Sequence, residues 1–329
     1  MLNYLGFKNT VNIRQKTTQL KTPPVPFEEI TIPYLRKREY RSSLGQLNEI
    51  ERNSNYTSFL TSYSSDGLKI NGLLTKPTVD MPKGGFPAIV FVHGYIPPTQ
   101  YQTLEKYKDY VDYLAKSGFI VFKIDLRGHG SSEGIPGGGY FGADYVIDTL
   151  NAYAALESSS FVNKKEIGLW GHSMAGNVVL RSMAVKPTIP AVNIWAGAVY
   201  TYVDLSEYGI NDQSYRPAQT TIAGITRNRR QEIFAKVGTP SATNIFWRLV
   251  APASFLNDIQ GAIQINHAID DTTVDIRYSD NLNLLLNNTS VPHEFYKYPT
   301  GGHNISGSSF DLAIQRTVIF FNKYLIKRF

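Results

Sequence analysis

The sequence predicts an α/β fold: one mostly parallel, eight-stranded sheet with helices on both faces and a mostly helical cap inserted late in the chain. Three observations predict it. Short β-branched runs alternate with segments of helical periodicity, which is typical of β-α-β units. This alternation stops over residues 200–255 and then resumes. The composition of the 329 residues, 42% hydrophobic and 18% charged, is that of an ordinary globular protein.

The elements follow one another from residue 55 onward. Strand alternation flanks the turn signal Ser65-Asp66-Gly67, which predicts a β-hairpin. In the first predicted helix, residues 104–114, Tyr107 is one of four apolar or aromatic residues at helical spacing. The predicted strands are 56–63, 68–75, 88–92, 119–124, 166–170, 191–196, 262–267 and 292–298, and the predicted helices are 104–114, 144–156, 174–184, 274–286 and 310–327.

The chain is expected to divide into three parts. Residues 1–54 form an N-terminal extension with a proline-rich linker at 21–26, where each proline removes a backbone donor and fixes φ. Residues 55–199 and 256–329 form the α/β core. Residues 200–255 form the cap, because this stretch is too long for a plain connection and shows no clear strand pattern.

Charge and composition exclude several classes of function. The formal net charge is +6 and the basic residues are scattered, so no nucleic-acid partner is expected. The absence of cysteine excludes disulfides, zinc-thiolate sites and a cysteine nucleophile. No cluster of His and Glu has metal-ligand spacing, so no metal or other cofactor is expected. No apolar run reaches the ~18 residues of a membrane span. No intact signal peptide is recognised, and compartment and oligomeric state stay open.

The strongest chemical signal is the segment Gly171-His172-Ser173-Met174-Ala175-Gly176. It follows a predicted strand and opens a predicted helix, which is the context of a G-x-S-x-G nucleophile elbow. A tight turn there exposes the serine hydroxyl, and small neighbours allow the strand and helix to approach. The fifth position is alanine rather than glycine. Because alanine is also small, Ser173 is still predicted to be a nucleophile that a base must activate.

A second signal, His93-Gly94-Tyr95, comes directly after a buried strand. Ligands of doubly wound sheets bind beyond the carboxyl ends of the strands. The backbone amides of Tyr95 and Met174 are therefore predicted to form an oxyanion hole, the second of them at a helix N-terminus. The Tyr95 ring is a candidate contact for the acyl group. His93 is interpreted as a structural residue that bonds nearby backbone.

An acidic pair and a glycine-lined histidine complete the set. Asp270 and Asp271 follow a late strand, and only one of two adjacent carboxylates can point toward a base. His303, in Gly301-Gly302-His303, lies in a loop after the last strand, where a histidine has little packing role. It is favoured over His293 as the base. His267 is interpreted as structural, and the chain order Ser, Asp, His is that of one serine-hydrolase fold.

With these blocks in this order, residues 55–329 resemble the α/β-hydrolase superfamily. They are most similar to the branch of the prolyl oligopeptidase catalytic domain and the dienelactone-hydrolase-like esterases, on three features: the 65–70 hairpin, the 125–130 segment, and the His-x-x-x-Asp-x-x-Val block at 267–274. The resemblance implies the α/β-hydrolase fold, with Ser173 as nucleophile, His303 as base and Asp271 rather than Asp270 as acid. It also implies Tyr95 and Met174 as oxyanion donors.

Two residues beside the acid depart from this family pattern. Ala268 stands where glycine is usual, and Asp275 where proline is common. The 54 residues ahead of the hairpin are too few for a β-propeller of four four-stranded blades, so no propeller is expected. A structural turn is expected at 125–130, with Asp125 and Arg127 as a candidate ion pair.

The leading functional prediction is hydrolysis of a small-molecule carboxylic ester through an acyl-enzyme. The predicted substrate-binding residues are Tyr95, His172, Trp195 and Tyr200. Aromatic residues in or beside the cap would suit an aromatic, feruloyl-type acyl group, or they form the core of the cap itself; they are Trp195, Tyr200, Tyr202, Tyr208, Phe246 and Trp247.

Two alternatives stay open. One is a serine peptidase of aminopeptidase or dipeptidyl type, for which Asp204, Glu207 and Asp212 are candidate ligands of a substrate amine. The other is a binding protein on a hydrolase scaffold that has no catalytic activity.

Overall fold

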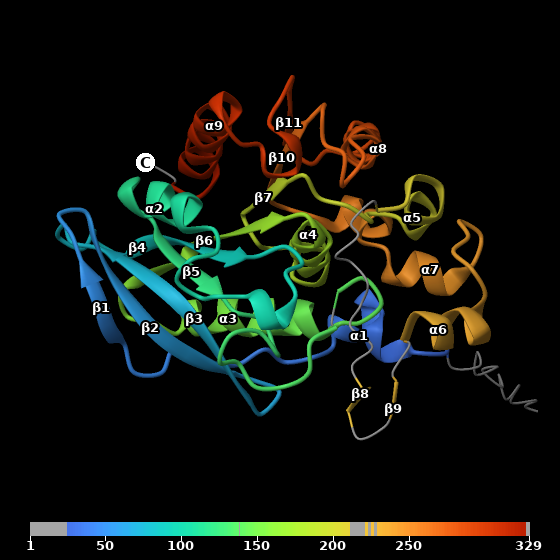
Figure 1. The fold of residues 1–329 in the computed structure, drawn as a ribbon, viewed down its shortest axis with the longest axis horizontal. Helices are drawn as coiled ribbons and strands as arrows, with labels where there is room; N and C mark the ends of the chain where they lie inside the picture. The colour runs from blue at the N-terminus through green and yellow to red at the C-terminus, as the bar shows by residue number, and fades with distance from the viewer. Residues whose placement is uncertain (1–24, 138, 211–220, 223–224, 227–228, 327–329) are drawn as a thin grey trace, which may run out of the picture.

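A nine-stranded sheet forms the centre of the computed structural model (Figure 1). The structure describes residues 25–137, 139–210, 221–222, 225–226 and 229–326. The strand order is β1-β2-β3-β5-β4-β6-β7-β10-β11. The strands are β1 (Asn48–Arg52), β2 (Tyr56–Ser65), β3 (Leu68–Pro77), β4 (Phe86–Val92), β5 (Ile120–Ile124), β6 (Val162–His172), β7 (Ala191–Trp195), β10 (Ala262–Ala268) and β11 (His293–Tyr298).

The sheet is parallel from β5 through β11 and antiparallel at the β1-β2-β3 edge. The predicted α/β class and the eight predicted strands are confirmed, and the 65–68 hairpin turn joins β2 to β3. The count of eight strands is one too low, because β1 adds to the edge. Every residue of β1 is exposed and four of its five residues are polar, so the strand has no apolar alternation to detect.

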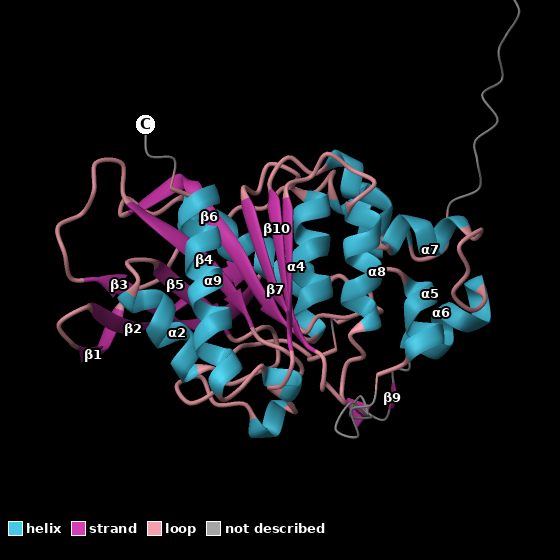
Figure 2. Cartoon of the chain, turned by 90° about the horizontal axis from the view of Figure 1, so that it is seen from above, coloured by secondary structure: helices cyan, strands magenta, loops and turns pink. Residues whose placement is uncertain are grey.

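Helices cover both faces of the sheet (Figure 2). One face carries α2 (Lys108–Lys116) and α9 (Ser308–Tyr324). The other carries α3 (Asp144–Glu157) and α4 (Met174–Val185), and α8 (Arg277–Leu286) packs into the same core cluster. Helix α2 begins four residues later than predicted, because Tyr107 adopts a left-handed conformation with φ of 60° at its N-cap. Because the helix begins at Lys108, Tyr107 lies at the end of the preceding loop rather than inside the helix.

Part of the predicted N-terminal extension is integrated into the core. A single 3-10 turn (Glu28–Ile30) and α1 (Ile32–Leu35) precede β1. The Arg36 guanidinium donates to the carbonyl oxygen of Ala184 at 2.7 and 2.9 Å, at the end of α4. The buried guanidinium of Arg181, on α4, donates to the carbonyl of Ile30. Residues 28–36 are therefore packed against the α/β core and β1 extends its sheet, and only residues 1–24 of the predicted extension lie outside the described residues.

Between β7 and β10 the described chain forms α5 (Tyr202–Tyr208), the β8 (Thr221–Ile222) and β9 (Ile225–Thr226) pair, α6 (Arg229–Val237) and α7 (Ile245–Val250), followed by a 3-10 segment (Pro252–Asp258). The rings of Tyr202, Phe246 and Trp247 are buried there. Trp247 lies 5.1 Å from Tyr202 and 5.0 Å from Phe246, measured between ring centroids. Within the described part of the chain, no helix is long and apolar enough to cross a membrane.

Candidate active site

Ser173 occupies the sharp turn between β6 and α4. Its φ of 57° and ψ of −121° lie outside the ordinary regions for a residue with a side chain, which is the strain expected of a nucleophile elbow. A Cβ added at Gly171 would lie 2.6 Å from the carbonyl oxygen of Ala175, so only glycine allows the strand to approach the helix this closely. Ala175 is itself fully buried and fits at the position where the motif usually has glycine.

The structure brings Ser173, His303 and Asp271 together from three separate loops. The Nε2 atom of His303 lies 2.9 Å from Ser173 Oγ, and its Nδ1 atom lies 2.8 Å from Asp271 Oδ2. With Nδ1 protonated, the ring donates to the carboxylate and its Nε2 can accept the serine proton. This tautomer is the one that general-base chemistry requires.

The carboxylate of Asp271 is fully buried and well supplied with donors. Its Oδ1 accepts from the amides of Thr273 and Val274 at 2.8 and 3.0 Å, and its Oδ2 accepts a second imidazole N–H, from His267 at 3.1 Å. Burial raises the pKa of this carboxyl, but the hydrogen bonds from His267 and His303 outweigh burial and hold the pKa below its usual range. Asp271 is therefore ionised in the folded protein near neutral pH.

Asp270, the other member of the acidic pair, has a separate task. Its carboxylate accepts from the amides of Gly302 at 2.8 Å and Gly301 at 3.2 Å, in the loop that carries His303. One carboxylate therefore contacts the base and its neighbour holds the backbone of the base loop. Sequence adjacency alone could not separate the two roles.

The His93-Gly94-Tyr95 segment lies against the elbow. A Cβ added at Gly94 would lie 3.1 Å from both the carbonyl oxygen of His172 and the Cβ of Ser173, so the backbone of this loop touches the candidate nucleophile. Met174 is the first residue of α4, and its amide has no carbonyl acceptor within the helix. Gly94, which directly precedes Tyr95, and Met174 therefore both lie next to Ser173. His93 is fully buried and its Nδ1 lies 2.7 Å from the carbonyl oxygen of Gly94.

The structure corrects three of the four predicted substrate contacts. Trp195 is fully buried on the interior strand β7, and its Nε1 donates to Thr317 of α9 at 3.1 Å. Tyr200 is also fully buried, in the core cluster on the α4 side of the sheet. His172 is 3% exposed and both of its ring nitrogens are hydrogen-bonded within the protein. Tyr95 is half-buried and stays a candidate contact for substrate.

Two other predictions about charged residues are changed by the structure. Asp125 accepts from Tyr101 and Thr103, both at 2.7 Å, and Arg127 instead pairs with Asp148 at 2.6 Å. The predicted pair of Asp125 with Arg127 is therefore wrong. Asp204 is buried, and Asn281 donates to both of its carboxylate oxygens, so it is not exposed as an amine ligand. Asp212 lies outside the described residues.

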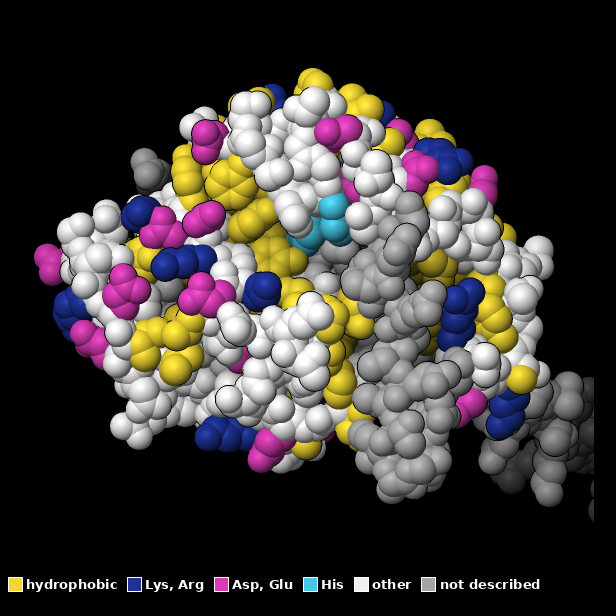
Figure 3. All heavy atoms as spheres, in the orientation of Figure 1, with side chains coloured by type: hydrophobic (Ala, Val, Ile, Leu, Met, Phe, Trp, Pro, Cys, Tyr) yellow, Lys and Arg dark blue, Asp and Glu magenta, His cyan; other side chains and the backbone are white. Residues whose placement is uncertain are grey.

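The candidate base is accessible from solvent, because the His303 side chain is 20% exposed. On the face in Figure 3, histidine side chains reach the surface at one place, beside hydrophobic side chains. Among the described residues, no group of three or more His, Asp or Glu side chains is arranged to hold a metal ion. The hydrogen-bonded groups at this place are a hydroxyl, an imidazole and a carboxylate.

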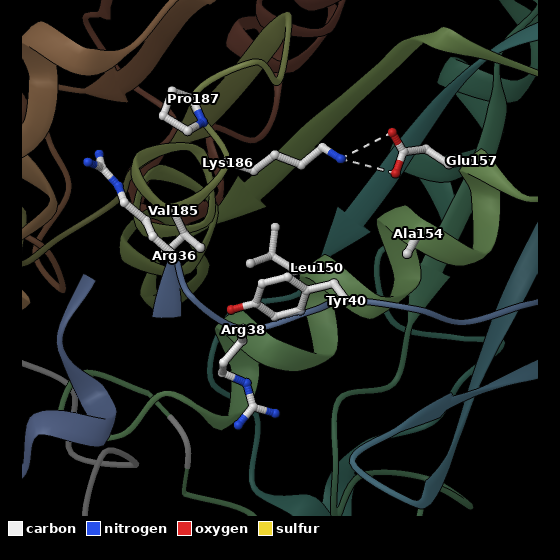
Figure 4. A pocket seen from close by; sticks show the side chains of 9 residues that line it. All are labelled: Arg36, Arg38, Tyr40, Leu150, Ala154, Glu157, Val185, Lys186 and Pro187. Atoms are coloured by element: carbon white, nitrogen blue, oxygen red, sulfur yellow. Dashed lines mark hydrogen bonds and ion pairs between the residues drawn. The ribbon is translucent and has the colours of Figure 1, made fainter. Parts of the chain in front are cut away.

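A separate cavity of about 320 Å³ lies at the other end of α4 (Figure 4). Three cationic side chains line it, and one of them, Lys186, directly follows that helix. Each of the three has a carboxylate partner: Lys186 with Glu157 at 3.1 Å, Arg36 with Asp258 at 2.7 Å and Arg38 with Asp66 at 2.5 Å. This cavity contains no member of the triad, and its charges are already compensated.

Comparisons with known proteins bear on the fold and on the class of protein that this chain resembles. Residues 86–228, which include Ser173, match a protein family described as serine aminopeptidase. An uncharacterized peptidase of Bacillus subtilis, YtmA, is 24% identical over 242 residues, or 73% of this chain and 84% of that protein.

Two solved structures share the fold. Acetyl xylan esterase 1 from Thermoanaerobacterium has a TM-score of 0.62 at 19% identity, over 91% of this chain and 95% of that one. The acylaminoacyl peptidase of Pyrococcus horikoshii has a TM-score of 0.63 at 18% identity, over 84% of this chain and 43% of that longer one. Esterases and peptidases thus share this architecture. Together with the matched family, they confirm the predicted architecture: the chain has the α/β-hydrolase fold, and its residues 86–228 are similar to a family of serine aminopeptidases.

Proposed function

We propose that this protein hydrolyses carboxylic esters through an acyl-enzyme on Ser173. One observation carries the proposal: the Ser173 Oγ, the His303 ring and the Asp271 carboxylate form a continuous chain of hydrogen bonds of 2.9 and 2.8 Å. A serine hydroxyl becomes a useful nucleophile when a positioned base takes its proton. The buried, ionised Asp271 keeps the imidazole in the tautomer that can do so.

In the first half of the reaction, Ser173 Oγ attacks the ester carbonyl carbon and His303 Nε2 takes the hydroxyl proton. The negative charge that develops on the carbonyl oxygen is stabilised by the amides of Tyr95 and Met174. A donor of this kind contributes about 3–4 kcal/mol to catalysis. As the tetrahedral intermediate collapses, the imidazolium of His303 returns its proton to the leaving alcohol, and the acyl group stays on Ser173.

In the second half, water takes the place of the alcohol. His303 accepts a proton from the water as it attacks the acyl carbon, and the second tetrahedral intermediate releases the carboxylic acid with the proton returned to Ser173. Asp271 stays ionised throughout and stabilises the imidazolium each time it forms. All proton transfers in the cycle pass through His303 Nε2.

The aromatic residues Trp195, Tyr200, Tyr202, Phe246 and Trp247 are buried, so they support a role in folding rather than an aromatic acyl pocket. Tyr95, half-buried beside the elbow, remains the proposed acyl contact. We retain residues 200–255 as a proposed cap, supported by their place between β7 and β10.

Peptide hydrolysis is a second candidate function, favoured by the match to the serine aminopeptidase family and by the fold shared with acylaminoacyl peptidase. An aminopeptidase must hold the substrate amine with a carboxylate or similar acceptor. Of the three predicted carboxylates, Glu207 is exposed on α5, while Asp204 is buried and bonded. Glu207 is therefore the one to test if the protein cleaves peptides.

The discriminating experiment compares p-nitrophenyl esters of two to eight acyl carbons with aminoacyl p-nitroanilides. We expect ester turnover by the wild type, loss of turnover in Ser173→Ala with an unchanged melting temperature, and no anilide turnover. Anilide turnover at a rate comparable with ester turnover would move the protein to the peptidases. Ester turnover that survives in Ser173→Ala would contradict the proposed nucleophile.

A further inference from the structure

We propose that Tyr107 and His172 are positioning residues that link the oxyanion loop, the nucleophile elbow and the base loop through one chain of hydrogen bonds. The Tyr107 hydroxyl lies 3.0 Å from the amide nitrogen of Gly94 and 2.7 Å from His172 Nδ1. The other ring nitrogen, His172 Nε2, lies 2.8 Å from the carbonyl oxygen of His303. Two side chains thus join the three backbone segments that carry the proposed chemistry.

The direction of each hydrogen bond follows from its partners. The carbonyl of His303 can only accept, so His172 Nε2 carries the hydrogen and donates. In a neutral ring, Nδ1 then has a lone pair and accepts from the Tyr107 hydroxyl. The hydroxyl oxygen in turn accepts from the Gly94 amide, which can only donate. Each donor in the chain therefore has one acceptor, and any other tautomer of His172 would break a link.

Burial favours this protonation state. His172 is 3% exposed, and its ring centroid lies 4.7 Å from that of His303. Burial, followed by repulsion from a charged His303, lowers the pKa of His172 to about 3. The groups that contact it are the hydroxyl and the carbonyl named above and the rings of Tyr107 and Trp170, while the charge of Asp271 acts in the opposite direction and raises the pKa of His172 by less than burial lowers it. His172 therefore stays neutral when His303 becomes protonated during the reaction, and the links persist.

Tyr107 is itself held firmly. It adopts φ of 60° where α2 begins, and its ring packs edge-on against Phe91 at 5.5 Å and Trp170 at 6.0 Å. The preceding loop is tied down by the buried Lys123, whose ammonium donates to the carbonyls of Thr103 and Lys106. Because its ring is packed and the preceding loop is anchored, Tyr107 can set the position of the backbone that its hydroxyl contacts.

The consequence is a link between two parts of the proposed catalysis. Gly94 directly precedes Tyr95, whose amide is a proposed oxyanion donor, and His303 is the proposed base. Moving either by a fraction of an ångström weakens transition-state contacts more than ground-state binding. Loss of the Tyr107 hydroxyl should therefore lower kcat and leave KM nearly unchanged. This inference rests on the proposed function, because both donor and base are assigned there.

The main test is Tyr107→Phe, which keeps the ring and removes both hydroxyl contacts. We expect kcat for p-nitrophenyl acetate to fall about 10- to 100-fold with KM within about twofold of the wild type. The matched control is Tyr56→Phe, which removes a hydroxyl bond of 2.7 Å to Asp112, away from the triad. The control should retain wild-type kcat, and melting temperatures of both variants separate lost stability from lost catalysis.

A second measurement reports on the oxyanion hole itself. The rate ratio of p-nitrophenyl acetate to its thiono analogue measures the contribution of the oxyanion donors, because sulfur is a poorer and longer hydrogen-bond acceptor than oxygen. We expect this ratio to fall in Tyr107→Phe and to stay unchanged in Tyr56→Phe. An unchanged ratio and an unchanged kcat in Tyr107→Phe would overturn the proposal.

Two variants of His172 complete the test. His172→Gln keeps an N–H near the Nε2 position, and His172→Leu keeps none, so the glutamine variant should retain more kcat than the leucine variant. Equal losses in both, with equal melting temperatures, would also overturn the proposal. Failure of the proposed function has a different signature, because the wild type would then turn over none of the esters. The wild type is therefore assayed first.

Discussion

Aromatic residues occur both in the loops around Ser173 and in residues 200–255, but the two regions use them differently. In the loops, the Tyr107 hydroxyl lies within 3.0 Å of two polar partners from separate segments of the chain. In the second region, the Trp247 ring packs against other rings, at 5.7 Å from Phe234 and 5.0 Å from Phe246. Polar pairing fixes the geometry of the first region, and ring packing builds the core of the second.

The partners of an aromatic residue indicate its role. A buried polar atom needs a partner, so a side chain with partners from several segments sets how those segments lie relative to one another. A buried ring needs only apolar surface and tolerates many arrangements of its neighbours. We therefore expect substitutions in the loops to change catalysis and substitutions of the buried rings to change stability.

The largest effect is expected at the acidic pair. Asp271→Asn removes the charge that stabilises the imidazolium and permits the wrong tautomer of His303, so kcat should fall about 10⁴-fold. Asp270→Asn keeps one acceptor oxygen for the Gly302 amide and loses the weaker contact with the Gly301 amide, so kcat should fall about tenfold or less. Steady-state kinetics on p-nitrophenyl acetate measure both. The reverse order of losses would show that the two carboxylates had been assigned wrongly.

A large loss of stability, rather than of activity, is expected from substitution of Trp247. Trp247→Ala removes a buried ring and should lower the free energy of unfolding by about 3–5 kcal/mol, because the cavity it leaves has no simple way to close. Urea denaturation followed by fluorescence measures the loss. The folded variant should keep the wild-type KM for every acyl length.

The matched control for Trp247 lies on the same helix. Ile245 is 54% exposed, and Ile245→Ala should leave stability within about 0.5 kcal/mol of the wild type. A change in the acyl-length profile of Trp247→Ala without loss of stability would place the ring in the substrate pocket. It would contradict a purely structural role of this ring.

The smallest effect is expected in the pH dependence of stability. The pKa of Asp271 is lower in the folded protein than in the unfolded chain, so the unfolded chain binds this proton first as pH falls. The stability contributed by the carboxylate is therefore complete above the unfolded pKa of about 4 and is lost as pH falls toward the folded pKa. Melting temperatures from pH 7 to pH 2.5 should converge for wild type and Asp271→Asn.

Ser173→Ala provides the control for this pH series, because it retains Asp271. Its melting temperature should follow that of the wild type across the same pH range. If the difference in melting temperature between wild type and Asp271→Asn stayed constant down to pH 2.5, protonation of this carboxylate would not be what destabilises the protein in acid.

Residues with a strict local context could be predicted from the sequence. Ser173 stands between a strand and a helix among small residues, and His303 stands between glycines after the last strand. Family resemblance favours Asp271 over Asp270, and in the structure side-chain direction separates them, with each carboxylate bonded to a different group. Such a direction is a tertiary property that adjacent residues do not reveal.

Other residues could not be predicted, for physical reasons. Tyr107 fits a helical pattern, yet its backbone turns left-handed before the helix begins. Trp195 and Tyr200 were expected at the substrate, but the packing of helices on both faces of the sheet buries them. The exposed β1 strand has no apolar face to mark it. In each case, tertiary packing decides a position that local periodicity leaves open or assigns wrongly.

The proposed role of Ser173, a nucleophile activated by His303 and Asp271, can be tested by covalent labelling. The most direct measurement is intact-mass spectrometry of the folded protein after reaction with a fluorophosphonate, followed by peptide mapping. We predict one adduct, on Ser173, that forms more slowly by orders of magnitude in Asp271→Asn and not at all in Ser173→Ala. No adduct on the folded wild type, or an adduct on another residue, would contradict the account.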